Sequence, residues 1–200
     1  MKAVIWISIF AMVLLWSGIE PKDGPTWFLE VLPALIGALV LALTRARFPL
    51  TPMLYSLILA HCIILMVGGH YTYAQVPLFD ELKEILGWQR NNYDKLGHFA
   101  QGLVPALIAR EIVLRREIIV SVGWRNFFIL CFCLALSAFY ELIEWWVALA
   151  TGAGAEAFLG TQGYIWDTQS DMAMALLGAL FAILVLAKTQ DRQLRAAGFI

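Results

Sequence analysis

Long blocks of apolar residues restrict this chain to one class of fold. Six such blocks follow one another, and most approach the ~20 residues that an apolar helix needs to cross a bilayer. They run over about residues 3–18, 27–43, 50–71, 96–113, 127–150 and 170–187. The sequence therefore predicts an all-α polytopic membrane helix bundle with about six transmembrane helices.

Composition agrees with this class and excludes others. Of the 200 residues, 61% are hydrophobic and 14% are charged, whereas soluble domains carry about a quarter charged residues. No repeat and no linker divides the chain, so residues 1–200 are expected to form a single integral membrane domain. The net charge of -1, without a basic run or a Gly-rich phosphate loop, predicts no nucleic-acid partner and leaves membrane lipids as the expected surroundings.

Two features of the apolar blocks invite other interpretations. Lys2 before the short first block is typical of a signal peptide, but "WSGIEPKDG" offers no A-x-A site, so we interpret the block as a retained span. Cys62, Cys131 and Cys133 lie deep in apolar blocks without metal-ligand spacing. They are expected to pack as small hydrophobic residues.

Two connections between the blocks are longer than the rest. Residues 76–92 contain "LFDELKEILGW", whose apolar positions recur with helical spacing and predict a short amphipathic helix in the membrane interface. Residues 151–168, "TGAGAEAFLGTQGYIWDT", are rich in glycine and predict a loop, either ordered or mobile.

Basic residues predict the orientation of the bundle, because cytoplasmic loops carry an excess of Lys and Arg. With a cytoplasmic N-terminus, ten of the 14 basic residues lie on the cytoplasmic side and four lie outside. The sequence therefore predicts a bacterial inner-membrane protein with both termini in the cytoplasm. The four outer basic residues are Lys22, Lys83, Arg90 and Lys95.

With this topology, unusual polar residues gather near the outer ends of four helices. In "NNYDKLGHFAQG", Asp94, His98 and Gln101 fall at i, i+4 and i+7 and share one face of a helix. His61 lies mid-span, and we interpret it as a satisfied polar residue away from this group. The other members are His70, Tyr71, Tyr73, Tyr93, Tyr140, Glu141, Glu144, Asp167, Ser170 and Asp171.

These residues have structural and functional interpretations. In the structural interpretation, Asp94 and Asp167 have a single role as N-caps of the helices that they open. Glu141, Glu144 and Asp171, like His98, lie one or more turns inside their helices, where an ionised side chain costs at least ~2.5–3.5 kcal/mol unless it is paired or hydrated. Because basic residues are few on that side, we expect the carboxylates to share protons, bind a cation or face a water-filled cavity open to the periplasm.

Ligand chemistry narrows the options for a cation. Mixed histidine and carboxylate ligands suit Zn²⁺, Mn²⁺ or Fe²⁺, while an all-oxygen subset suits Ca²⁺ or Mg²⁺. No H-E-x-x-H motif occurs, and Ser137 and Ser170 do not lie in a G-x-S-x-G elbow. Covalent catalysis is therefore not expected.

Four stretches carry a resemblance to a known family: "GGHYTYAQVPLFDELK", "RNNYDKLGHFAQGLVPALIAREI", "SAFYELIEWW" and "FLGTQGYIWDTQSDMAMALLGA". Together, over about residues 68–178, they resemble the YjdF-like family of bacterial inner-membrane proteins. That resemblance implies the fold and the membrane location but no reaction. A looser resemblance is to VanZ-like proteins, which are associated with glycopeptide resistance, and it implies a role in the cell envelope. It covers Asp94, Lys95, His98, Glu141 or Glu144, and Asp167 or Asp171.

Three functional hypotheses remain open. In the first, the protein is a metal-assisted envelope enzyme that hydrolyses a lipid or lipid-linked substrate. In the second, it is a non-catalytic binder or transporter of a cation or small amphiphile. In the third, it is an accessory subunit of a larger membrane complex. The roles assigned under the first hypothesis are a divalent metal held by His98, Glu144 and Asp171, a general base at Glu141, orientation of His98 by Asp94, and substrate binding by Tyr140, Tyr164 and Trp166.

Overall fold

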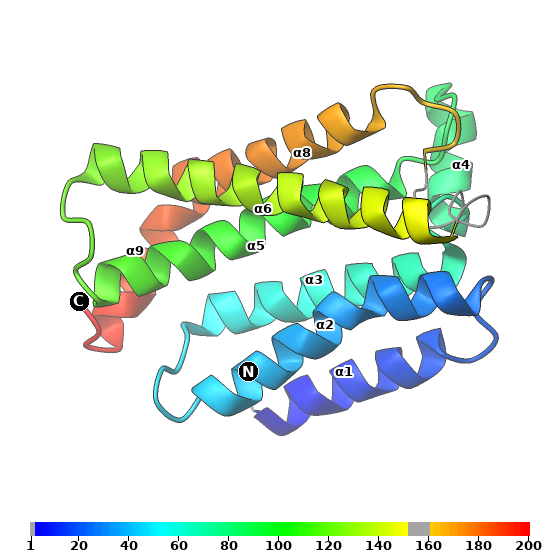
Figure 1. Cartoon of the computed structure of the whole chain (residues 1–200). Helices are drawn as coiled ribbons and strands as arrows, with labels where there is room; N and C mark the ends of the chain where they lie inside the picture. The colour runs from blue at the N-terminus through cyan, green and yellow to red at the C-terminus, as the bar shows by residue number, and fades with distance from the viewer. Residues whose placement is uncertain (1–2, 152–160) are drawn as a thin grey trace.

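A computed structural model describes residues 3–151 and 161–200 of the chain (Figure 1). Every regular element in these ranges is helical, which confirms the predicted all-α fold class. The elements are α1 (Ala3–Ser17), α2 (Gly24–Thr44), α3 (Pro52–Tyr71), α4 (Pro77–Leu86), α5 (Tyr93–Arg115), α6 (Val122–Thr151), α8 (Asp167–Phe181), the π-helical η2 (Ala182–Leu186) and α9 (Ala187–Ala196).

Each of the six predicted blocks coincides with a helix. Within the described ranges, four helical segments are long and apolar enough to cross a membrane: α2, α3, α6 and the continuous stretch from α8 to α9. Helix α1 has only 15 residues, and α5 carries charged residues near both ends. For α1 and α5, membrane crossing therefore stays a prediction.

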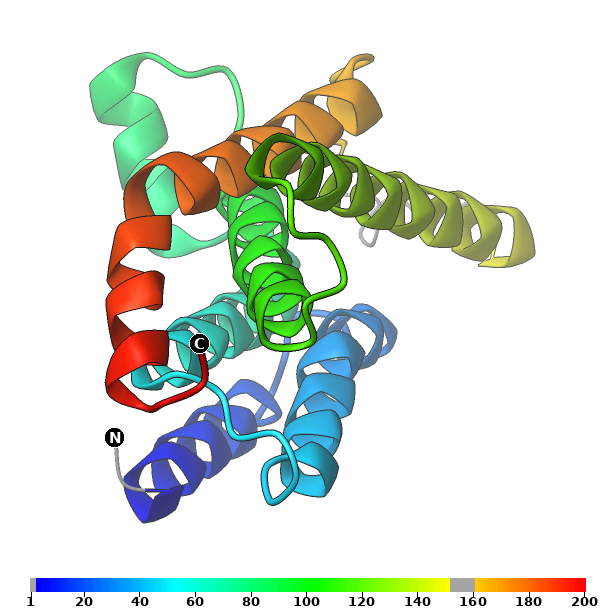
Figure 2. The same ribbon diagram turned by 90° about the vertical axis from the view of Figure 1, so that its left-hand side faces the viewer.

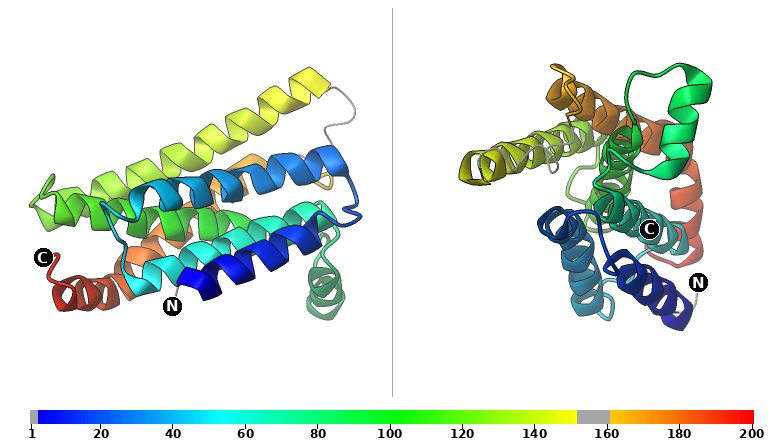
Figure 3. Two further views of the ribbon diagram at one scale, coloured as in Figure 1. Left: turned by 90° about the horizontal axis from the view of Figure 1, so that it is seen from below. Right: turned by 90° about the vertical axis from the view of Figure 1, so that its right-hand side faces the viewer.

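The helices form two groups that meet at α5. Helices α1, α2 and α3 lie together, while α6 and α8 lie on the other side of the molecule (Figures 1 and 2). Helix α5 contacts α3, α6 and α8, so it is the centre of the bundle. Both chain ends lie toward the end of the bundle opposite α4 (Figures 1 and 3).

Local sequence signals account for several helix ends. Asp23 accepts a hydrogen bond from the backbone N–H of Thr26 at 2.8 Å and so caps α2. Helices α3 and α4 begin at Pro52 and Pro77, where the missing N–H of proline costs nothing. The predicted amphipathic helix is α4, which lies across the end of the bundle (Figure 3). Its place at a membrane interface stays a prediction.

The closest helix contact joins α5 to α8, because glycine lets the two backbones approach. A methyl group at Gly102 would overlap the carbonyl of Ala175, and one at Gly178 would overlap the carbonyl of Phe99. Small residues of this kind are typical of packed membrane helices. The contact brings the first turns of α5 and α8 together, and these turns carry most of the predicted site.

The last helical stretch is longer than predicted and bends at η2. Helix α8 begins at Asp167, three residues before the predicted start, and helical structure continues to Ala196. The chain changes direction near η2 (Figures 1 and 2), since a π-helical turn interrupts the regular hydrogen-bond ladder. Of the predicted loop 151–168, residues 152–160 lie outside the described residues.

A buried polar network closes the end of the bundle that holds the chain termini. The carboxylate of Glu111 is fully buried. It accepts hydrogen bonds from Thr51 N at 3.1 Å, Thr51 Oγ1 at 2.9 Å, Arg115 at 3.1 Å and Gln190 at 3.3 Å. Gln190 also accepts from Arg110 at 3.0 Å. This Glu111 network ties α3, α5 and α9 together, and the sequence analysis did not anticipate it.

Candidate functional site

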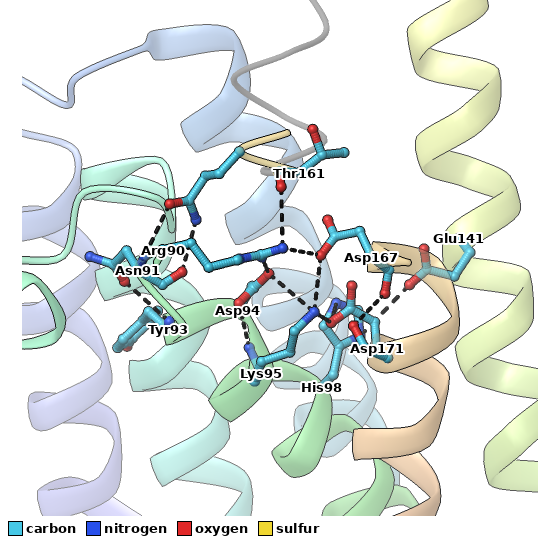
Figure 4. A network of polar contacts seen from close by, with 12 residues as sticks. Arg90, Asn91, Tyr93, Asp94, Lys95, His98, Glu141, Thr161, Asp167 and Asp171 are labelled. Carbon is cyan, nitrogen blue, oxygen red and sulfur yellow. Dashed lines mark hydrogen bonds and ion pairs between the residues drawn. The ribbon is translucent and has the colours of Figure 1, made fainter. Parts of the chain in front are cut away.

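Five charged side chains form a salt-bridge cluster where α5 and α8 begin (Figure 4). Arg90 pairs with Asp94 and, at 2.5 Å, with Asp167. Lys95 Nζ lies 3.0 Å from Asp167 Oδ1 and 2.6 Å from Asp171 Oδ1. The cluster therefore joins the connection before α5 to the first turns of both helices.

Residues from the connecting loops hold the salt-bridge cluster in place. Arg90 also donates to the carbonyl of Thr161 at 3.2 Å, and the ring of Tyr164 lies 5.5 Å from the Arg90 guanidinium. Burial alone would lower the pKa of Arg90, but the neighbouring carboxylates of Asp94 and Asp167 outweigh it and raise the pKa. Arg90 consequently stays charged at any physiological pH.

His98 lies one turn deeper along α5 and faces two carboxylates. Its Nδ1 is 3.0 Å from Gln101 Oε1 and 3.9 Å from Glu141 Oε1. Its Nε2 is 3.7 Å from Asp171 Oδ1. One potential ligand atom from each of His98, Glu141 and Asp171 lies within 4.8 Å of the other two.

Beside His98 is a cavity of about 200 Å³ that we call the acidic pocket. Tyr140 lies on its wall, and its hydroxyl group donates a hydrogen bond of 3.3 Å to Glu30 Oε2. Apolar residues make up much of the remaining wall. The lining residues are Glu30, Pro33, His61, Leu65, Tyr73, Asp94, Gly97, His98, Gln101, Pro105, Leu136, Tyr140, Glu144 and Asp171.

The pocket and the cluster together hold more acid than base. Glu141 is 8% exposed, and its Oε1 is buried without a hydrogen-bond partner among the described residues. Two basic side chains, Arg90 and Lys95, face the carboxyl groups of this region. Those six groups belong to Glu30, Asp94, Glu141, Glu144, Asp167 and Asp171.

The structure brings several predicted site residues together, with different neighbours from those expected. Asp94 pairs with Arg90 and Lys95, while the hydrogen-bond partner of His98 Nδ1 is Gln101. Glu144 lines the acidic pocket, but Asp171 and Glu141 supply the carboxylate oxygens that lie 3.7 Å and 3.9 Å from the His98 ring.

The predicted aromatic residues separate into two places. Tyr140 lines the acidic pocket, whereas Tyr164 covers Arg90 and Lys95 from the loop side. Trp166 immediately precedes α8, is 58% exposed and is not among the residues that line the pocket. Of the three predicted substrate-binding residues, only Tyr140 therefore borders the space next to His98.

Two histidines lie elsewhere than the sequence suggested. His61 was expected away from the site, yet it lines the acidic pocket. His70 was expected within the group, but its Nδ1 lies 3.0 Å from the carbonyl of Ser17 and its ring packs on Trp16 at 4.6 Å. His70 thus ties α3 to the end of α1.

Sequence reasoning also missed Glu30 and the role of Arg90. Glu30 had a recognisable signal, because it is a lone acidic residue inside the apolar block of α2. Arg90 had none, since its role depends on how the loop before α5 folds. Gln101 was placed on the face of Asp94 and His98 by its spacing, and its hydrogen bond with His98 was not predicted.

Apolar helices, small-residue packing and a buried group of ionisable side chains define a polytopic α-helical membrane protein. A family described as predicted membrane proteins (DUF2238) matches residues 2–192. The chain belongs to this family. It is also 56% identical over 189 residues to the inner membrane protein YjdF of Escherichia coli (strain K12), covering 94% of this chain and 90% of that protein. No solved structure matches the chain.

Proposed function

We propose that a divalent metal ion binds beside the acidic pocket, with His98, Glu141 and Asp171 as its ligands. The observation that carries the proposal is the buried Oε1 of Glu141, which has no hydrogen-bond partner among the described residues. An unpaired carboxylate oxygen inside a membrane protein is costly, and a cation removes that cost.

The arrangement of His98 supports the same conclusion. When Nδ1 donates to Gln101 Oε1, Nε2 is left with a lone pair that faces Asp171 Oδ1 at 3.7 Å. Lys95 Nζ already holds the same Asp171 oxygen at 2.6 Å, so the lone pair of Nε2 is what remains open to a cation. Zn²⁺ lies roughly 2.0–2.2 Å from nitrogen and oxygen ligands, so one ion can reach both atoms. Gln101 would then act as the outer partner that orients the ligating ring.

A second group of carboxylates is less suited to a metal. Asp94, Asp167 and Asp171 also approach one another closely, but Arg90 and Lys95 already neutralise them. Lys95 bonds both Asp167 and Asp171. It therefore keeps a carboxylate partner when Asp171 turns to a metal.

The walls of the pocket favour an enzyme over a simple cation binder. Acidic and phenolic groups lie beside the apolar side chains of Leu65 and Leu136, a combination that suits a lipid or lipid-linked substrate. A bound divalent metal supplies a polarised water. Glu144, which lines the pocket outside the ligand group, is placed to accept a proton from it, and Tyr140 is placed to position the substrate.

We also propose an inner-membrane location with both termini in the cytoplasm and the acidic pocket toward the periplasm. Ten of the 14 basic residues then lie inside, and the related E. coli protein is an inner-membrane protein by name. A reporter that is active only in the periplasm should be silent when fused after Ile200. Strong activity would reverse the orientation.

Lipids are the proposed partners of the outer surface of α6. Phe128, Phe132, Phe139 and Trp146 are each about half exposed there, and the far end of α6 diverges from the other helices (Figure 3). A second membrane subunit could cover the same aromatic surface. Either environment removes these rings from water.

Thermal unfolding of the full chain in detergent tests the metal site. Zn²⁺ or Mn²⁺ should raise the unfolding midpoint and a chelator should lower it, because a ligand at 100 times its Kd stabilises by about 2.7 kcal/mol. Glu141→Gln should abolish this response, since glutamine keeps the shape but loses the charge. Glu144→Gln is the matched control inside the pocket and should keep the response.

The same measurement distinguishes a metal from a shared proton. If neighbouring carboxyl groups only share protons, Glu141→Gln mimics the neutral form and should be harmless or stabilising. Midpoints that ignore both metal and chelator in the native protein, together with a stable Glu141→Gln variant, would rule out the metal.

A further inference from the structure

The end of the bundle opposite the acidic pocket holds a second polar cavity, which we call the arginine pocket. It has a volume of about 320 Å³ and lies where α5 ends, α6 begins and α9 runs beside them (Figure 2). Nothing in the proposed metal site uses it. Its lining residues are Arg110, Leu114, Arg125, Asp191, Arg195 and Ile200.

Positive charge in the arginine pocket exceeds negative charge. Asp191 Oδ1 lies 2.7 Å from Arg110, an ion pair that is not aligned as a hydrogen bond. Arg125 is only 9% exposed, and its Nε is buried without a hydrogen-bond partner among the described residues. Three arginines and one aspartate therefore line the cavity, and the printed distances pair Asp191 with Arg110.

The buried Nε of Arg125 lacks a hydrogen-bond partner among the described residues, which is costly, so the cavity beside Arg125 should hold an anion. We propose that the arginine pocket binds a phosphate group, carried by an anionic phospholipid headgroup or by a soluble phosphate. The planar fork of arginine matches the oxygens of phosphate and forms paired, charge-assisted hydrogen bonds with them.

The backbone of α6 adds to the attraction. Arg125 is the fourth residue of this helix, and the first turn contains no acidic residue. The free N–H groups of a first turn carry partial positive charge, which favours an anion. Arg125 lies in this first turn, so its side-chain charge and the partial charge of the turn lie at the same end of α6.

Neighbouring Arg115 is an example of an arginine whose guanidinium is bound by other groups of the protein. It donates to Glu111 at 3.1 Å and to the carbonyl of Pro49 at 2.6 Å. Its guanidinium also lies 3.5 Å from the ring centre of Phe48. Arg125 has no comparable set of partners, which makes it the arginine left for a ligand.

Thermal unfolding of the full chain in detergent, at constant ionic strength, tests the proposal. Inorganic phosphate in place of chloride, or phosphatidylglycerol in place of phosphatidylcholine in the mixed micelles, should raise the native midpoint by several degrees. Arg125→Gln should lose this rise. Without phosphate, the same variant should be at least as stable as the native protein, because it relieves repulsion from Arg110.

Two further variants keep the test independent of the folding of Arg125→Gln. Arg195→Gln removes an exposed lining residue and should weaken phosphate binding at least threefold. Arg192→Gln removes an exposed arginine of the same helix that does not line the pocket, and it should bind like the native protein.

The two sources of phosphate give different results. A response to phosphatidylglycerol alone identifies a lipid headgroup, and a response to inorganic phosphate identifies a soluble ligand. The proposal is wrong if neither probe shifts the native midpoint, if Arg125→Gln responds fully, or if Arg192→Gln loses the response as strongly as Arg195→Gln.

Discussion

The two ends of the bundle both bury a carboxylate, but they satisfy it differently. In the Glu111 network, donors from Thr51, Arg115 and Gln190 surround the carboxylate oxygens. Beside the acidic pocket, Glu141 keeps an oxygen without a hydrogen-bond partner among the described residues, and acids outnumber bases around it. One end is electrostatically complete and the other is not.

This difference separates a structural role from a binding role. A buried charge whose hydrogen bonds are all made by the protein holds helices together and has no capacity left for a ligand. When a buried charge lacks one of its hydrogen-bond partners, the protein's own contacts do not offset the free-energy cost of desolvating it. Burial by itself therefore does not identify a functional carboxylate, whereas the count of its partners does.

Replacing the two carboxylates with alanine should give the largest contrast. Glu111→Ala leaves Arg115 and the Thr51 donors buried without their acceptor, which should lower the free energy of unfolding by about 3–5 kcal/mol. Glu141→Ala, measured with chelator present, should change it by less than about 1 kcal/mol, because it removes an unsatisfied charge. Equal losses in denaturant titrations of the two variants would contradict the comparison.

A second, smaller effect should follow from separating α5 and α8. Gly102→Ala places a methyl group against the carbonyl of Ala175 and should cost about 1–3 kcal/mol. It should also weaken the metal response, since Lys95 and Asp171 would move apart. Gly37→Ala is the matched control because nothing lies near its added methyl group, and it should be neutral or stabilise by up to ~1 kcal/mol.

The smallest change in the free energy of unfolding should come from replacing Asp23. This carboxylate is largely solvated, so it serves as a reference for the buried carboxylates. Asp23→Ala should cost about 0.5–1 kcal/mol near neutral pH through loss of the cap on Thr26. The hydrogen bonds with Thr26 lower the pKa of Asp23. Its stabilisation is therefore complete above the unfolded pKa of ~3.9 and is lost as the pH falls through the lower folded value.

Unfolding curves of the native protein and Asp23→Ala between pH 6 and pH 3 measure this loss. Asp23→Asn is the control, because asparagine also caps helices but does not titrate. A difference between native protein and Asp23→Ala that stays constant down to pH 3 would show that the cap does not depend on the charge.

The helices were largely predictable from the sequence, because apolar blocks and helical spacing mark them directly. The amphipathic spacing in 76–92 likewise predicted α4. Within the site, the free-energy cost of isolated charges in a membrane was enough to propose that several polar residues are neighbours. These residues are Asp94, His98, Glu141 and Asp171.

What the sequence could not supply was the pairing among those charges. Arg90 reaches Asp94 and Asp167 because the loop before α5 folds back over both helices. Glu111 is fully buried, and no pattern in the sequence indicated which donors would surround it. Pairing depends on distances between segments far apart in the chain, and no local pattern encodes them.

The close contact of α5 with α8 has a consequence for biosynthesis. Lys95 and Asp171 are separated by 76 positions, so a nascent chain that has just completed α5 lacks the acids of α8 that will pair with it. Helix α5 is too charged to rest in lipid alone. We therefore expect the translocation machinery to retain α5 until α8 emerges, and these two parallel helices to enter the lipid together with α6, which connects them.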